Sequence, residues 1–418
     1  MKLNATYIKI RDKWWGLPLF LPSLILPIFA HINTFAHISS GEVFLFYLPL
    51  ALMISMMMFF SWAALPGIAL GIFVRKYAEL GFYETLSLTA NFIIIIILCW
   101  GGYRVFTPRR NNVSHGDSRL ISQRLFWQIV FPATLFLILF QFAAFVGLLA
   151  SRENLVGVMP FNLGTLINYQ ALLVGNLIGV PLCYFIIRVV RNPFYLRSYY
   201  SQLKQQVDAK VTKKEFAIWL LALGALLLLL CMPLNEKSTI FSTNYTLSLL
   251  LPLMMWGAMR YGYKLISLLW AVVLMISIHS YQNYIPIYPG YTTQLTITSS
   301  SYLVFSFIVN YMAVLATRQR AVVRRIQRLA YVDPVVHLPN VRALNRALRD
   351  APWSALCYLR IPGMEMLVKN YGIMLRIQYK QKLSHWLSPL LEPGEDVYQL
   401  SGNDLALRLN TESHQERI

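Results

Sequence analysis

The sequence predicts an all-α polytopic membrane domain of about ten transmembrane helices, followed by a truncated α/β cytoplasmic domain. Of the 418 residues, 57% are apolar and only 13% are charged, and the mean hydropathy is +0.51, far above that of a water-soluble domain. Ten apolar runs contain no Asp, Glu, Lys or Arg. The region after residue 330 has instead the mixed pattern of a soluble domain.

A bilayer core of about 30 Å needs roughly 20 apolar residues in a helical span, and this length defines the candidate spans. The third candidate, 63–74, is short, and together with the second, 43–62, it is also compatible with one broken or re-entrant hairpin. The ten runs are 17–35, 43–62, 63–74, 86–103, 125–150, 163–187, 216–233, 245–259, 265–279 and 299–317.

The distribution of Lys and Arg predicts the orientation. With the N-terminus inside, the cytoplasmic segments hold 23 basic residues, and the other side holds only Arg75, Lys76, Arg152 and Lys237. Arg75 and Lys76 are thus a local exception to the positive-inside rule. The segments 31–42 and 280–298, expected as external loops, carry no Lys or Arg. We therefore expect a multi-pass membrane protein with both termini in the cytoplasm. The net charge of +19 follows from this topology and from anionic lipid, and needs no nucleic-acid partner.

Polar residues inside the spans are candidates for ligand binding or for helix packing. They include Asn91, Gln170 and Asn176, with His31 near the outer end of the first span. Amides in membranes more often join helices than bind ligands. Ion-coupled transporters usually bury an ionisable group, and its absence from the spans disfavours transport.

After the last span, Val322, Ile326 and Leu329 form an apolar stripe among arginines, which predicts that the helix continues through 316–330. This stripe is compatible with a homodimer that pairs through 318–330, and a basic juxtamembrane anchor explains it equally well. Asn340 has the position of a helix N-cap. The run 354–361 predicts a strand, a helix-like segment includes Tyr379 and Trp386, and 398–409 predicts a hairpin. This order of strand, helix and hairpin indicates an α/β or α+β domain.

Two membrane segments resemble pieces of the MASE-type bacterial membrane sensor domain. They are WAALPGIALGIFV at 62–74 and VGNLIGVPLCYF at 174–185. In that family an Asp usually follows the first glycine of the second piece, where this chain has Asn176. The resemblance implies a sensor at 1–317, a signalling helix at 318–330 and an output region from 331 to 418.

The output region resembles the N-terminal part of a GGDEF domain, the fold that makes cyclic di-GMP from two GTP molecules. DPVVHLPNVRAL at 333–344 is similar to the family's entry segment, RIPGMEMLVKNYG at 360–372 to its metal-binding segment, and SGNDL at 401–405 to the signature itself.

The resemblance also implies that the catalytic equipment is lost. The two metal-binding carboxylates fall on Arg360 and Asn403, and the guanine-reading Asn and its partner Asp fall on Val368 and Ile377. Ser401 replaces the first glycine, and only Gly402 and Asp404 of the signature are retained. An arginine brings positive charge to a cation site. We therefore expect no catalytic, cofactor-binding or metal-binding residue in this chain, and we do not expect it to be a cyclase.

This arrangement resembles that of cyclic-di-GMP phosphodiesterases. It implies an EAL domain after residue 418, which would use Mg or Mn to hydrolyse cyclic di-GMP to the linear dinucleotide. Cyclic di-GMP would then bind only to that EAL domain. The alternative from the sequence is a polytopic transport protein with a cytoplasmic tail.

Overall fold

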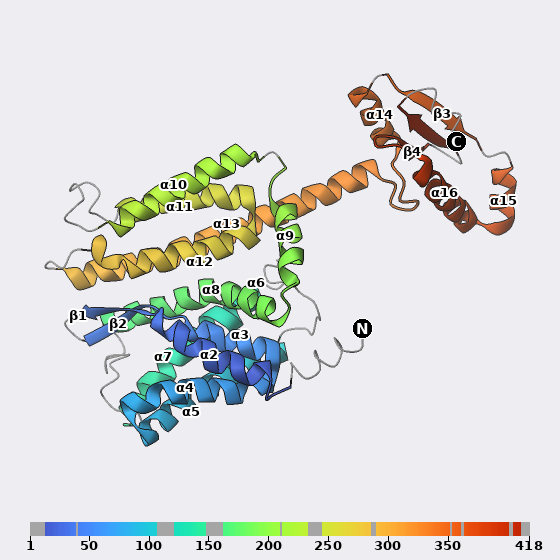
Figure 1. Cartoon of the computed structure of the whole chain (residues 1–418). Coiled ribbons are helices and arrows are strands. Elements are labelled where there is room, and N and C mark those ends of the chain that lie inside the picture. Colours follow the sequence, from blue (N-terminus) through green and yellow to red (C-terminus); the bar gives the residue numbers. More distant parts are fainter. Residues whose placement is uncertain are drawn as a thin grey trace. The chain divides into compact units, whose positions relative to one another are not determined.

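The computed structural model describes residues 13–38, 41–106, 121–147, 162–209, 211–232, 245–285, 290–351, 353–360, 363–400 and 404–410. The chain divides into two compact units, Met1–Arg318 and Gln319–Ile418, and each is described by itself. Figure 1 labels their elements.

The first unit is built almost entirely of helices, as its composition predicts. Every predicted span coincides with a helix over most of its length. Within the described residues, six helical stretches are long and apolar enough to cross a membrane, and the apolar helices Leu17–His31 and Tyr263–His279 are shorter. The count of ten crossings stays a prediction. The helices are α2 (Leu17–His31), α3 (Pro49–Phe60), α4 (Leu65–Leu80), α5 (Phe82–Phe106), α6 (Ile121–Arg124), α7 (Phe131–Phe145), α8 (Leu163–Arg191), α9 (Tyr195–Gln206), α10 (Lys213–Cys231), α11 (Tyr245–Tyr261), α12 (Tyr263–His279) and α13 (Tyr291–Tyr331), with a π-helical turn at Leu125–Val130 and 3₁₀ turns at Ser61–Ala64 and Tyr281–Asn283.

A β-hairpin corrects the expected start of the second span. The segment 31–42 was expected as a loop and 43–62 as a helix, but β1 (Thr34–Ile38) pairs antiparallel with β2 (Gly41–Phe46), and α3 begins only at Pro49. Buried and exposed side chains alternate along β1, so one face of the hairpin packs against the protein and the other is exposed. The side-chain oxygen Oδ1 of Asn168 on α8 accepts a hydrogen bond from the Phe44 N–H at 2.7 Å, which fixes β2 against the bundle.

The chain reverses direction at the 3₁₀ turn Ser61–Ala64. The Leu48 N–H donates to Asn33 Oδ1 at 3.0 Å, so α3 begins beside the C-terminal end of α2. A Cβ on Gly67 would lie 2.5 Å from the Pro18 carbonyl oxygen, so α4 begins beside the N-terminal end of α2. Helix α3 therefore returns along α2, and α4 runs parallel to α2. The segment 43–74 is thus two antiparallel helices and not one continuous helix.

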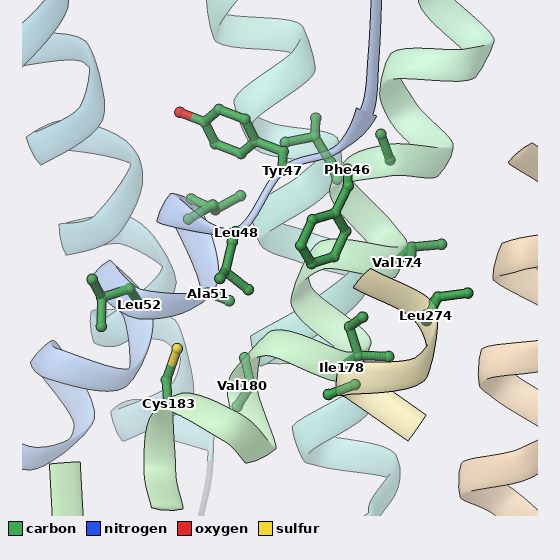
Figure 2. Close-up of a cluster of buried hydrophobic side chains, with 14 of the residues drawn as sticks. Phe46, Tyr47, Leu48, Ala51, Leu52, Val174, Ile178, Val180, Cys183 and Leu274 are labelled. Atoms are coloured by element: carbon green, nitrogen blue, oxygen red, sulfur yellow. The ribbon is translucent and has the colours of Figure 1, made fainter. Parts of the chain in front are cut away.

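The core of this unit lies where α3 meets α8 (Figure 2). Leu48, Ala51 and Leu52 pack here with Ile178 and other side chains of α8, and all of them are almost fully buried. Gly175 and Gly179 lie on the side of α8 that faces α3 and its preceding residues, since a Cβ at either position would meet Tyr47, Leu48 or Ala51. Two glycines one turn apart let the backbones approach closely, as in other membrane helix pairs.

The second unit contains the strand, helices and hairpin that the sequence predicts. Helix α13 continues to Tyr331, as its apolar stripe predicts. Asn340 is confirmed as an N-cap, because its Oδ1 accepts from the Arg342 and Ala343 N–H groups at 3.0 and 3.1 Å. The remaining elements are α14 (Val341–Asp350), β3 (Ala355–Leu359), α15 (Met364–Tyr371), α16 (Ile373–Leu387), a 3₁₀ turn (Ser388–Leu390), β4 (Asp396–Gln399) and β5 (Leu405–Leu409).

The sheet of this unit has the order β3–β5–β4, and both pairings are antiparallel. The described strands therefore form an α+β arrangement, and the parallel sheet that the α/β class implies is not found among them. Every residue of β5 is buried, because this strand is central and its Leu405, Leu407 and Leu409 pack with Val336, Leu387 and Val397.

Candidate functional site

A pocket with a volume of about 690 Å³ lies in the membrane unit, between the β-hairpin and the helices α2 to α5. Its wall includes Phe44, Met53, Ile72, Leu88 and Phe92, which are all buried. Volumes of roughly 300–1,000 Å³ with mainly apolar walls are typical of small-molecule sites. The cavity is therefore large enough for a compact organic ligand.

Charged side chains line one part of this pocket, and most of them are paired with each other. Lys76 Nζ lies 2.8 Å from Glu79 Oε2 on α4. His37 Nδ1 lies 3.3 Å from Glu42 Oε1, directly across the β1–β2 ladder. Arg75 Nη1 donates instead to the carbonyl of Pro27 at 3.1 Å, near the negative C-terminal end of the α2 dipole.

Close packing of α4 against α2 determines the position of Arg75. Gly67 and Gly71 face α2, where a Cβ on Gly71 would lie 3.2 Å from the Pro22 carbonyl oxygen and from Leu26. The Ser23 hydroxyl donates to the carbonyls of Leu19 and Gly67 at 2.7 and 3.1 Å, which ties the two helices together. Arg75 lies two turns beyond Gly67 on α4 and therefore reaches the far end of α2.

The membrane residues selected from the sequence do not come together in this pocket. His31 is exposed at the end of α2. Asn91 donates to the Ser87 carbonyl of its own helix at 3.3 Å, and Gln170 Nε2 donates to Ser300 Oγ at 2.7 Å. The Gln170 contact joins α8 to α13, which favours a packing role for this residue. The pocket residues were missed, although Arg75 and Lys76 carried a signal as exceptions to the charge rule.

Asn176 lies beside the π-helical turn that precedes α7. Its Nδ2 donates to the Ile129 carbonyl at 3.4 Å, and its Oδ1 is buried without a hydrogen-bond partner among the described residues. Gln128 Nε2, on the same turn, is also buried without a partner there. A cavity of about 90 Å³ adjoins this turn and includes Gln128, Ile129 and Asn310 in its wall. Buried amides with spare hydrogen-bonding capacity mark this turn as a second polar feature of the bundle.

Four of the seven positions selected in the second unit belong to the described residues, and they lie at the adjacent ends of β3 and β5 and on two helices. Arg360 is exposed just after β3, and Asp404 precedes β5 on the neighbouring strand. The Tyr358 hydroxyl donates to the Asp404 carboxylate, and this bond is the main cause that raises the pKa of Tyr358. Val368 is half-buried on α15, and Ile377 packs against the core around Leu407. Ser401, Gly402 and Asn403 lie outside the described residues.

One buried cation in this unit was missed from the sequence. Lys380 on α16 is only 1% exposed, and burial is the main cause that lowers its pKa. Arg376 acts in the same direction, while Asp404 and Asp333 oppose it. Among the described residues, no group of three or more His, Cys, Asp or Glu side chains could hold a metal ion.

The helical bundle, its hairpin and its pocket belong to a known class of membrane domain. Residues 15–320 match the MASE1 family, and the chain is a member of that family. Two curated relatives are similar over nearly the whole chain. "Cyclic di-GMP phosphodiesterase PdeF" of Escherichia coli (strain K12) is 99% identical over 418 residues, which are 100% of this chain and 56% of that protein.

The second relative is more distant. "Probable cyclic di-GMP phosphodiesterase PdeA" of Escherichia coli (strain K12) is 26% identical over 416 residues, which cover 97% of this chain and 55% of the relative. The chain thus spans little more than half the length of either protein. No solved structure matches it.

Proposed function

We propose that this chain is the membrane sensory and regulatory portion of a cyclic-di-GMP phosphodiesterase. The observation that carries the proposal is the 99% identity to PdeF over all 418 residues. In this proposal, an EAL domain outside residues 1–418 hydrolyses cyclic di-GMP to linear pGpG with Mg or Mn. The relatives do not support the alternative of a transport protein.

The proposed domain order is a MASE1 sensor at 1–317, a signalling helix at 318–330 and the N-terminal part of a degenerate GGDEF domain at 331–418. Arg360, Val368 and Ile377 support the degeneracy, since a cation and two apolar side chains cannot bind Mg²⁺ or read a guanine edge. Ile377 has in addition a packing role in the core. This domain would then transmit the signal without performing chemistry.

In the cell, the protein would be a multi-pass protein of the bacterial inner membrane. Its helices would contact the lipid bilayer, and both termini would lie in the cytoplasm. A homodimer through 318–330 is part of the proposal. Its support is the stripe Val322, Ile326 and Leu329, whose side chains are 47%, 59% and 57% exposed at helical spacing on α13. Dimerisation would cover this stripe.

The experiment that tests the function compares the full-length protein with chain 1–418, both in nanodiscs with Mg²⁺ or Mn²⁺. We expect the full-length protein to convert cyclic di-GMP to pGpG, and chain 1–418 neither to hydrolyse cyclic di-GMP nor to condense GTP, as followed by chromatography. Arg360→Ala in the full-length protein is the matched control, and its hydrolysis rate should change less than about twofold because no metal is bound there.

Two results would contradict the proposal separately. Production of cyclic di-GMP from GTP by chain 1–418 would show an active cyclase. Absence of hydrolysis by the full-length protein, in the presence of either metal, would remove the phosphodiesterase assignment.

A further inference from the structure

We propose that the 690 Å³ pocket binds a small amphipathic monocarboxylate, with Arg75 binding the carboxylate and the apolar wall enclosing the body of the ligand. The pocket lies at the end of α4 that the charge distribution predicts to face outward. The inference deepens the proposed regulatory function, since it names the class of signal, but binding itself can be measured without any phosphodiesterase activity.

The first argument is the state of the charged groups in the pocket. The two acids have partners, because Glu79 pairs with Lys76 and Glu42 pairs with His37. Arg75 has no carboxylate within 4.0 Å among the described residues, and its hydrogen bond to the Pro27 carbonyl uses one of five N–H donors. Arginine matches a carboxylate with two parallel hydrogen bonds. Arg75 is therefore the cation with capacity for an anionic ligand.

The second argument is the unusual position of Arg75 in the charge distribution. It is half-buried beside Ile72, at the end of α4 predicted to lie on the side with few basic residues, where a cation is an exception to the positive-inside rule. Glu79 feels the charge of Arg75 but is hydrogen-bonded to Lys76, and the Pro27 carbonyl carries no full negative charge. A bound carboxylate would give Arg75 an anionic partner of its own.

The third argument limits the ligand to one negative charge and an apolar body. The other two cations of the wall, His37 and Lys76, lie beside Glu42 and Glu79, so Arg75 supplies one positive charge for one carboxylate on the ligand. Met53, Leu88 and Phe92 are each under 7% exposed and give their part of the wall no hydrogen-bond donor. An aliphatic or aromatic body would instead gain from burial against them.

The test uses the full-length protein in nanodiscs of neutral phosphatidylcholine. Phenylacetate and hexanoate are the probes. The alcohols 2-phenylethanol and hexan-1-ol are their uncharged analogues, with the same apolar body and no carboxylate. Binding is measured by calorimetry and by the shift of the unfolding temperature. We expect saturable binding of the acids, and affinities for the alcohols that are lower by about tenfold or more, because the charge-assisted hydrogen bonds are lost.

Three variants locate the binding. Arg75→Met should lower the affinity for the acids by about tenfold or more without affecting the alcohols, and Arg75→Lys should retain part of it. Arg104→Met is the matched control, since Arg104 stacks on Trp100 and does not line the pocket. It should bind both acids like the unaltered protein. An Arg75→Met protein that still binds the alcohols is folded, which excludes misfolding as the cause.

Repeating the titration with phosphatidylglycerol in the nanodisc distinguishes a free ligand from a lipid. Unchanged affinity supports a free carboxylate, and competition that Arg75→Met abolishes supports the same anion site occupied by a lipid headgroup. The proposal is overturned if neither acid binds, if acids and alcohols bind equally, or if Arg75→Met and Arg104→Met behave alike. None of these outcomes depends on cyclic-di-GMP hydrolysis.

Discussion

Replacing Gly175 by alanine is expected to destabilise the membrane unit by about 3 kcal/mol, near the upper end of the usual cost of overpacking. The added Cβ would lie 2.0 Å from the carbonyl oxygen of Tyr47 and 2.8 Å from its carbonyl carbon. Both are backbone atoms, so no change of rotamer can relieve the contact. Helix α8 would have to move away from the segment that joins β2 to α3, at the centre of the core drawn in Figure 2.

The measurement is the unfolding temperature of the purified protein in one detergent, with the folded yield as a second readout. Gly224→Ala is the matched control, because a Cβ at Gly224 on α10 meets no atom within 4 Å. This control should leave stability unchanged or slightly increased, as alanine has the higher helix propensity. Equal unfolding temperatures for the two variants would contradict the close packing of α8 against Tyr47.

Replacing Asn340 by alanine is expected to loosen the connection between α13 and α14 and to cost the second unit about 2 kcal/mol. Asn340 Oδ1 caps α14, while its Nδ2 donates to the Ala330 carbonyl in the last turn of α13 at 2.9 Å. Loss of an N-cap costs about 1 kcal/mol, and loss of a second hydrogen bond costs about as much again. The change would therefore affect both helices at once.

Hydrogen exchange measured by mass spectrometry in the full-length protein checks this prediction. Asn340→Ala should accelerate exchange in the last turn of α13 and in the first turn of α14. Asn340→Asp is the matched control, because its carboxylate keeps the cap but cannot donate to Ala330, so only the end of α13 should exchange faster. Protection at both helix ends in Asn340→Ala would disprove the connecting role.

The sequence predicts the membrane unit well where one physical signal dominates. Hydrophobic length locates the helices of the ten predicted spans, because lipid requires internally satisfied backbones, but it does not locate the polar helix α9. The same signal is wrong for 43–46, since VFLF is as apolar in a strand as in a helix and only the pairing with β1 distinguishes them. Length alone also cannot show that the chain turns back at Ser61, which depends on contacts of α4 with Pro18 and Leu19.

The candidate site was harder to predict from the sequence. Polarity within the spans selected Asn91 and Gln170, but Asn91 donates to the Ser87 carbonyl of its own helix and Gln170 Nε2 donates to Ser300 Oγ on α13, so neither residue lines the pocket. The pocket depends instead on buried apolar residues whose sequence neighbours look ordinary, such as Met53 and Leu88. Arg75 was visible as a violation of the charge rule, and its meaning emerged only from its position beside the cavity.

The parallel pairing of α2 with α4 has a consequence for the biogenesis of the protein. Helix α2 has 15 residues and contains Pro22 and Pro27, so it rises only about 22 Å, less than a bilayer core of about 30 Å. Its close partner surface at Gly67 and Gly71 is synthesised some fifty residues later. We therefore expect α2 to enter the membrane as a metastable segment and to reach its final position only after α3 and α4 have left the ribosome, so that the insertion of α2 is coupled to that of α3 and α4.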